Sequence, residues 1–216
     1  MEEGEVMAFE VTRVQLGEMG TNGYILYDNV SGDCAFIDVG DYGERLRVFL
    51  KNKGIDKIRY ILLTHGHFDH IKGVKKLKAD FGGEVVIHSL DSDCLYDSSK
   101  SLGDFFGLSM PSFEADKIVE DGDRLPFGET EIEVIHTPGH TVGSVCYKIS
   151  DMLFSGDTLF CGSIGRTDFP GGSMLQMTAS LKKLAKLEGN YKVYPGHDDL
   201  SDLDTERRTN LYMKGM

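Results

Sequence analysis

Short apolar runs recur along the chain and are separated by Gly, Asn, Asp or Ser, a pattern that predicts β-strands joined by turns. The run at Ile58–Leu63 is apolar almost throughout, as expected of a strand that is buried on both faces. The other predicted strands are Phe9–Leu16, Tyr24–Tyr27, Cys34–Asp38, residues 84–88, Glu131–Ile135, Ser144–Ile149, Met152–Phe154 and Lys192–Tyr194.

Between these strands, apolar residues spaced three or four apart predict amphipathic helices. One begins near Leu46 and ends at Gly54, a second runs from Ile71 to Phe81, and the acidic tail predicts a short C-terminal helix. A further helix carries Met174, Met177, Leu181 and Leu184 on one face. Short strands with helices between them predict two sheets packed face to face and covered by helices outside. No Pro-, Gly- or Ser-rich linker divides the chain, so we expect residues 1–216 to form a single domain.

Composition and charge exclude several classes of function. The chain has 216 residues, 40% of them hydrophobic, and a formal net charge of −12. A protein this acidic would repel a phosphate backbone, which excludes nucleic acid as the expected partner. No apolar stretch approaches the roughly 20 residues that span a bilayer, so we expect no membrane segment.

The N-terminal segment and the cysteines indicate the compartment. Glutamates stand at the start of the chain where a secretory signal would carry basic residues and an apolar core, which predicts a cytoplasmic protein. No two cysteines form a C-x-x-C pair, so neither a disulfide framework nor a cysteine zinc site is expected. We therefore interpret Cys34, Cys94, Cys146 and Cys161 as reduced and buried thiols.

The segment "THGHFDH" directly after the strand at 58–63 carries metal-ligand chemistry. His65 and His67 are two positions apart, so they cannot share a helix face and must lie on a loop, where we expect Gly66 to let the backbone turn. Asp69 and His70 follow at the start of the next helix. Imidazoles and a carboxylate suit Zn²⁺ or Fe²⁺. Four such groups exceed what one open catalytic ion takes from a single segment, so the pattern predicts two metal ions.

Further metal-type side chains follow later strands in the same way. His140 follows Pro138-Gly139, Asp157 follows Gly156, and His197 follows Pro195-Gly196. Each lies at the end of a predicted strand, so each of these loops contributes one candidate ligand.

These motifs, in the order T-H-x-H-x-D-H, P-G-H-T, G-D-T-L-F, G-R-x-D-F and P-G-H, resemble the metallo-β-lactamase fold superfamily, and within it the glyoxalase II branch. The resemblance covers essentially the whole chain. It implies a four-layer αββα sandwich of two mixed sheets with helices outside and the site at one edge. It also implies a support role for Asp38, which matches the aspartate of the family's D-x-G turn. The implied ligands are His65, His67 and His140 for a first metal, Asp69, His70 and His197 for a second, and Asp157 as the bridge.

The resemblance implies a binuclear hydrolase. Two ions hold a water between them and lower its pKa toward 7, so that hydroxide is the expected nucleophile. We expect Asp69 to ligate and to take the proton. A thioester suits this site because a thiolate leaves without much help from an acid. The expected metal is zinc, with iron or manganese as alternatives, because these ligands accept all three.

The substrate is less closely defined. Glyoxalase II enzymes add a helical C-terminal part to the glutathione site, and this chain ends a few tens of residues after its last expected ligand. Arg166 matches the family's basic residue, but two tyrosines of the family are Asp168 and Asp199 here. The chain resembles the short bacterial glyoxalase II-like hydrolases, which implies a small-molecule substrate, a 2-hydroxyacyl thioester similar to S-lactoylglutathione. We expect Arg166 to bind a carboxylate or carbonyl end of it, the alternative being a salt bridge to Asp168.

Other interpretations stay open. A mononuclear iron persulfide dioxygenase shares the G-R-T-D-F segment, but the P-G-H at 195–197 speaks against it. A lactonase or β-lactamase, and a non-catalytic metal-storage or scaffold role, are the other rivals. Residues 101–113 are either an apolar lid or core beneath a loop. His88 and His136 match no expected ligand and are interpreted as structural. The oligomeric state does not follow from the sequence.

Overall fold

The computed structural model describes residues 9–216, so most of the N-terminal segment that argued against a secretory signal lies outside the described residues. The first six strands form one mixed sheet in chain order. Pairing is antiparallel from β1 to β3 and parallel from β3 to β6. The strands are β1 (Phe9–Leu16), β2 (Thr21–Asp28), β3 (Cys34–Ile37), β4 (Tyr60–Leu62), β5 (Glu84–His88) and β6 (Lys117–Val119).

A second mixed sheet has the order β14-β13-β10-β9-β8-β7. Its only parallel pair is β10 with β13, and the other neighbours are antiparallel within the described residues. Its strands are β7 (Arg124–Phe127), β8 (Thr130–His136), β9 (Val145–Ile149), β10 (Met152–Gly156), β13 (Lys192–Pro195) and β14 (Ser201–Asp202), and a separate small hairpin pairs β11 (Leu159–Phe160) with β12 (Ser163–Ile164).

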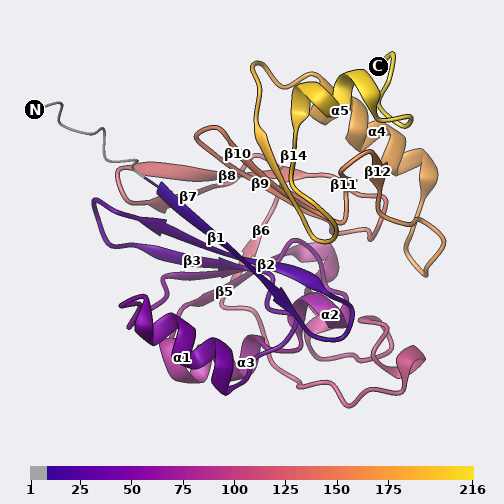
Figure 1. The fold of residues 1–216 in the computed structure, drawn as a ribbon. Coiled ribbons are helices and arrows are strands. Elements are labelled where there is room, and N and C mark those ends of the chain that lie inside the picture. The colour runs from indigo at the N-terminus through magenta and orange to yellow at the C-terminus, as the bar shows by residue number, and fades with distance from the viewer. Residues whose placement is uncertain (1–8) are drawn as a thin grey trace, which may run out of the picture.

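The two sheets lie face to face and the α-helices cover their outer faces (Figure 1). The predicted four-layer αββα sandwich is therefore confirmed. Helices α1 (Glu44–Asn52), α2 (Phe68–Ile71) and α3 (Val74–Phe81) pack on the first sheet, whereas α4 (Met174–Ala185) and α5 (Leu203–Thr209) pack on the second. The short 3₁₀ helices η1 (Ser89–Leu95) and η2 (Asp104–Phe106) follow β5.

Central strands are buried on both faces, which explains why their sequences are apolar without alternation. On β3, Phe36 packs with the helices, while Ala35 and Ile37 face the second sheet. On β10, Leu153 packs against α4 and α5, and Phe154 lies between the sheets. Strands fixed on two sides hold the loops at their ends in defined positions.

The helix predicted from Ile71 to Phe81 is two helices in the structure, α2 and α3. The chain breaks at Gly73, whose N–H donates to the carbonyl oxygen of Val39 at 2.8 Å. A Cβ added at Gly73 would lie only 2.6 Å from the carbonyl carbon of Asp41. This close approach needs a glycine and interrupts the helix. The short strands β6, β7, β11, β12 and β14 were not predicted, because so few residues give no usable periodicity.

The remaining predictions on composition can be compared with the structure. All four cysteines are free, as expected, and Cys34 and Cys146 are buried, but Cys161 is exposed and Cys94 is half-buried. Burial was therefore predicted correctly for two of the four thiols. Within residues 9–216, no helix is both long enough and apolar enough to cross a membrane.

Candidate metal centre

All seven predicted ligand residues lie in one cluster at an edge of the sandwich. The loop after β4 supplies His65 and His67, and the loops after β8, β10 and β13 supply His140, Asp157 and His197. The remaining two, Asp69 and His70, lie on α2. Strand ends from both sheets therefore bring together residues that lie far apart in the sequence.

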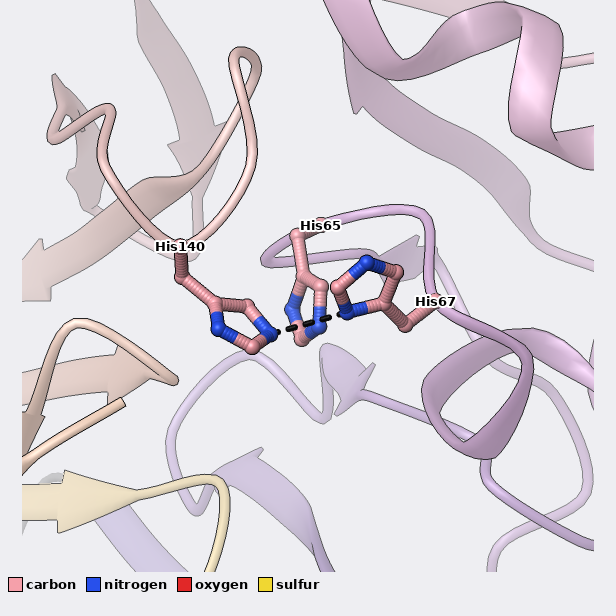
Figure 2. A group of neighbouring side chains, drawn as sticks. All are labelled: His65, His67 and His140. Atoms are coloured by element: carbon pink, nitrogen blue, oxygen red, sulfur yellow. Dashed lines mark hydrogen bonds between the residues drawn. The ribbon is translucent and has the colours of Figure 1, made fainter. Parts of the chain in front are cut away.

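Three imidazoles form the first group, and Figure 2 shows their rings converging from two loops. Nδ1 of His67 and Nε2 of His140 are 2.8 Å apart, and the ring of His65 lies beside both. Nδ1–H of His140 donates to the carbonyl oxygen of Arg166 at 2.7 Å. The carbonyl can only accept, so in neutral His140 the Nε2 atom carries a lone pair that faces the group.

The second group consists of Asp69, His70 and His197. Nε2 of His197 lies 3.2 Å from Oδ2 of Asp69. The carboxylate of Asp157 faces both groups, because its oxygens lie 3.4 Å from Nε2 of His70, 3.4 Å from Nε2 of His140 and 3.6 Å from Nε2 of His197. This position between the groups is the one that a bridging ligand requires.

Asp38 sets the orientation of two of the rings. It is 1% exposed, and its carboxylate accepts Thr64 N–H at 2.8 Å, the Thr64 hydroxyl at 2.7 Å and His70 Nδ1–H at 2.9 Å. The Thr64 hydroxyl uses its one hydrogen in the bond that it donates to Asp38, so its oxygen accepts from Nδ1–H of His65 at 3.1 Å. In their neutral forms, both His65 and His70 therefore direct an Nε2 lone pair into the cluster.

The buried atoms at the centre fit a metal ion better than they fit one another. Nε2 of His65, Nε2 of His70 and Oδ1 of Asp157 are buried without a hydrogen-bond partner. Gaps of 3.4 Å between such atoms are too long for good hydrogen bonds. They match the separation of two atoms that each lie about 2 Å from a shared ion. Imidazole and carboxylate ligands suit zinc, iron or manganese.

Burial and neighbouring charges shift the pKa values of these groups. Burial, assisted by the other histidines, holds the pKa of His65 and of His67 well below the ordinary histidine value. Burial alone would also lower the pKa of His70, but the carboxylates of Asp69, Asp38 and Asp157 raise it to about 10. The cluster as a whole thus contains two rings that resist protonation beside one, His70, that attracts a proton and hence a cation.

Asp69 is held in its ionised form. Burial would raise the pKa of its carboxyl, but His70, His197 and the hydroxyl of Thr21 bring that pKa well below the usual range. The Thr21 hydroxyl donates to Oδ2 of Asp69 at 3.0 Å. A general base works best with a pKa near the working pH. The low value therefore favours the ligand role of Asp69 over the proton-accepting role that the sequence also suggested.

A cavity of about 410 Å³ lies over the cluster. His67, Asp69, His140, Asp157 and His197 all line it. The rest of its wall is largely apolar, which suits a small organic substrate with a hydrophobic part. The apolar lining residues are Met19, Phe68, Leu102, Phe106, Phe160, Ile164 and Phe169.

Arg166 also lines this cavity, but its guanidinium is engaged. Nε and Nη2 both donate to the carboxylate of Asp168 at 2.8 Å, and the guanidinium lies 4.0 Å from the centre of the Phe169 ring. The pair is exposed to solvent. The geometry favours the salt-bridge alternative for Arg166 over direct substrate binding.

Part of the segment 101–113 packs on the core, and part of it lines the cavity. Met110 and Phe113 pack on the core beneath the loop. Leu102 and Phe106 line the cavity, and Phe105 is 73% exposed beside Phe169. Core packing therefore anchors one end of the segment, while its tip forms a cavity wall.

His88 and His136 lie outside the metal cluster and make structural contacts, as predicted. Their rings stack at 4.1 Å. The backbone N–H of Leu90 donates to Nδ1 of His88, and Nε2–H of His136 donates to the carbonyl oxygen of Val142. That second bond closes the loop that carries His140.

Two features of the site differ from the sequence analysis or were missed by it. Gly66 does not have a positive φ angle, so the left-handed conformation is not the reason for glycine at this turn. A Cβ there would lie 2.4 Å from Cβ of Cys94, so close packing is the reason for glycine. Asn22, which no motif indicated, donates to the carbonyl oxygens of Pro195 and Asp198 on either side of His197.

Comparison with known proteins gives a consistent result. Residues 16–197 match the model of the Metallo-beta-lactamase superfamily. The chain is 35% identical to the probable metallo-hydrolase YqgX of Bacillus subtilis over 94% of this chain and 97% of that one. It is 32% identical to the hydroxyacylglutathione hydrolase GloC of Haemophilus influenzae, over 84% and 87% of the two chains.

Two solved structures have the same fold. The BLEG-1 B3 metallo-beta-lactamase superposes with a TM-score of 0.89 at 33% identity, covering 95% of this chain and 100% of that one. The di-iron-bound form of TTHA1623 superposes with a TM-score of 0.83 at 36% identity, covering 93% and 99%. The second of these similar proteins holds two metal ions.

Replacement of Asp38 by Asn tests the orienting network. Asp38 has a φ angle of 56°, which Asn tolerates, so the backbone should not change. The amide cannot accept all three donors, and we expect a loss of about 1–3 kcal/mol of stability and of roughly 10–100-fold in metal affinity. Thermal unfolding and metal content after dialysis measure these effects. Unchanged affinity for both ions would contradict the role of Asp38.

Metal binding should release a proton from His70. Its stabilising charge in the metal-free chain is fully present below the unfolded pKa near 6.5 and is lost as the pH rises toward about 10. A metal ion at Nε2 replaces that proton, so we expect release of about one proton near neutral pH. Calorimetry in buffers of different ionisation enthalpy measures it. The matched variant His88→Asn should release the same number of protons on metal binding as the wild type. Binding heats of the wild type that do not depend on the buffer would refute the predicted proton release.

Proposed function

Because the chain belongs to the Metallo-beta-lactamase superfamily, we propose that it is a binuclear metal-dependent hydrolase that cleaves a 2-hydroxyacyl thioester. The observation that carries the proposal is the group of unpartnered buried ligand atoms beneath the cavity. Similarity to a protein named hydroxyacylglutathione hydrolase supports the thioester class. We take residues 1–216 as one domain that acts on a small molecule in the cytoplasm.

The ligand assignment is part of the proposal. His65, His67 and His140 would hold one ion, Asp69, His70 and His197 would hold the other, and Asp157 would contact both. The neighbouring ligand atoms support the assignment. His65, His67 and His140 lie together, and so do Asp69, His70 and His197. Asp157 groups with His65 and His70 and lies 3.4 Å from Nε2 of both His70 and His140. Zinc is the proposed metal, and the di-iron form of a similar protein keeps iron as the alternative.

When bound, the two ions supply hydroxide at neutral pH and polarise the substrate's carbonyl group. The chain's own residues orient these reactants. Thr21 and Asp38 fix Asp69 and His70 on one side, and the carbonyl oxygen of Arg166 fixes His140 on the other. A thioester fits because its thiolate leaves without a strong general acid.

The cavity wall supports a substrate with an apolar portion near the metals. Phe68, Phe106 and Phe169 form aromatic walls around the entrance to the cluster. Arg166 is the one Lys or Arg among the described lining residues, and Asp168 balances its charge. We propose a thioester similar to S-lactoylglutathione, with the carrier thiol bound mainly through contacts other than this arginine.

Asp69→Ala tests the proposed reaction. We expect wild-type protein with about two metal equivalents to release thiol from S-lactoylglutathione or a related 2-hydroxyacyl thioester, and the variant to lose roughly 100-fold or more of that rate. Elemental analysis and a thiol-release assay measure both quantities. The control is Asp151→Ala, an exposed aspartate paired with Lys192, which should leave the rate unchanged. One iron, oxygen uptake and no thiol release would instead favour the dioxygenase.

Asp168→Asn tests the role of the arginine pair. Loss of the carboxylate frees the guanidinium for an anionic carrier, so we expect KM for S-lactoylglutathione to fall by about 1.5–5-fold, the size of an exposed ion-pair interaction. For a thioester of an uncharged thiol, KM should not change. A rise in KM for both carriers would show that the pair mainly shapes the loop.

A further inference from the structure

Asp91 is a buried carboxylate close to the metal cluster that belongs to neither ligand group. It lies in η1, directly after β5, and is 1% exposed. Burying a carboxylate is costly unless its oxygens accept hydrogen bonds. Its partners therefore indicate what it does.

Its hydrogen bonds reach both loops of the first ligand group. Oδ2 accepts the N–H of Gly66 at 3.0 Å and the hydroxyl of Thr141 at 2.6 Å, and Oδ1 accepts the N–H of Gly143 at 2.8 Å. Gly66 lies between His65 and His67. Thr141 directly follows His140, so one carboxylate joins the two segments whose imidazoles converge in Figure 2.

The packing around Asp91 requires close contact with both loops. A Cβ added at Gly143 would lie 2.6 Å from Cγ of Asp91. On the other loop, a Cβ at Gly66 would lie 2.4 Å from Cβ of Cys94, which is also in η1. Glycines at these two positions allow η1 to pack directly between the loops.

The bond to Thr141 is part of a closed turn. The N–H of Thr141 donates to Oγ of Ser144 at 3.0 Å, and the two hydroxyl oxygens lie 2.7 Å apart. Because the Thr141 hydroxyl uses its one hydrogen in the bond that it donates to Asp91, the Ser144 hydroxyl donates to the Thr141 oxygen. The network orders the backbone on the C-terminal side of His140, opposite the contact between the His140 ring and Arg166.

Charge gives Asp91 a second effect. No Lys or Arg of residues 9–216 forms an ion pair with it, and its three donors are neutral groups. A buried negative charge that bonds to both loops lowers the energy of a cation held between their imidazoles. Asp91 therefore favours metal at this site through both position and charge.

We infer that Asp91 is a positioning residue of the first metal site, which fixes the His65–His67 loop relative to the His140 loop. The inference rests on the proposed ligand groups. The second group has separate supports, since Thr21 bonds to Asp69 and Asn22 bonds to the loop of His197. Loss of Asp91 should therefore weaken one ion selectively.

The variant Asp91→Asn keeps the shape but removes the charge and one acceptor. We expect the affinity of the first site for Co²⁺ or Zn²⁺ to fall about 10–100-fold, and that of the second site to change much less. Metal titration of the chelator-treated full-length protein, followed by the visible absorption of Co²⁺, measures both. A His140→Ala variant identifies which absorption belongs to the first site.

The matched control is Asp28→Asn. Asp28 is also a buried aspartate, 3% exposed, that accepts from a backbone N–H and a hydroxyl, those of Val30 and Ser31, in the turn after β2. We expect this control to lower the melting temperature and to leave both metal affinities unchanged. The same behaviour in Asp91→Asn would overturn the inference, because it would show a purely structural role.

The inference can still be tested if Asp91→Asn does not fold or if the proposed function fails. If Asp91→Asn does not fold, Thr141→Val removes only one of the three bonds and should still weaken the first site, by a smaller factor. Unchanged first-site affinity in Thr141→Val would then overturn the inference. If wild type binds one ion, or hydrolyses no thioester, the proposed function fails, while the effect of Asp91 on the ion at the three histidines is still measured.

Discussion

The burial of four imidazoles against one another is the constraint on which the rest of the site depends. His65, His67, His70 and His140 are each at most 4% exposed, and their ring nitrogens face a common space. Lone pairs that converge in a buried space repel one another unless a cation lies between them. Bonds to Thr64, Asp38 and the carbonyl oxygen of Arg166 fix the rings of His65, His70 and His140 in this arrangement. The protein therefore prepares the coordination geometry before a metal binds.

The sandwich delivers this geometry through reciprocal contacts between its sheets. Tyr147 on β9 donates to the carbonyl oxygen of Leu63, two residues before His65. From the opposite sheet, Tyr24 on β2 donates to the carbonyl oxygen of Pro195, two residues before His197. Both tyrosines are buried and lie in the layer between the sheets. Each sheet thus fixes a ligand loop of the other, and a shift between the sheets would move the ligands.

Sequence reasoning found the parts of the site that are encoded locally. The H-x-H-x-D-H segment and the histidines after Pro-Gly are short patterns, and the apolar strands before them are strong signals. It missed Asn22, whose partners lie 173 and 176 positions away, and Asp91, whose partners lie up to 52 positions away. Pairing at such distances leaves no local pattern. The reason for Gly66 was missed in the same way, since Cys94 meets it only in the folded chain. Residue types predicted the chemistry, whereas the supports that orient it required the structure.

Charge balance involves both the expected ligands and the buried residues that support them. Four carboxylates lie in or directly behind the cluster. Asp38, Asp91 and Asp157 are buried, and the Asp69 side chain is 15% exposed. The described lysines and arginines form no ion pair with them. Two divalent ions carry the opposite charge to these four carboxylates. One divalent ion would neutralise only half of this negative charge, and protons would have to neutralise the rest. In the metal-free chain, the excess negative charge raises the pKa of His70. The distribution of charge therefore supports the proposed pair of ions over a single one, and the proposed activation of water between two metals requires such a pair.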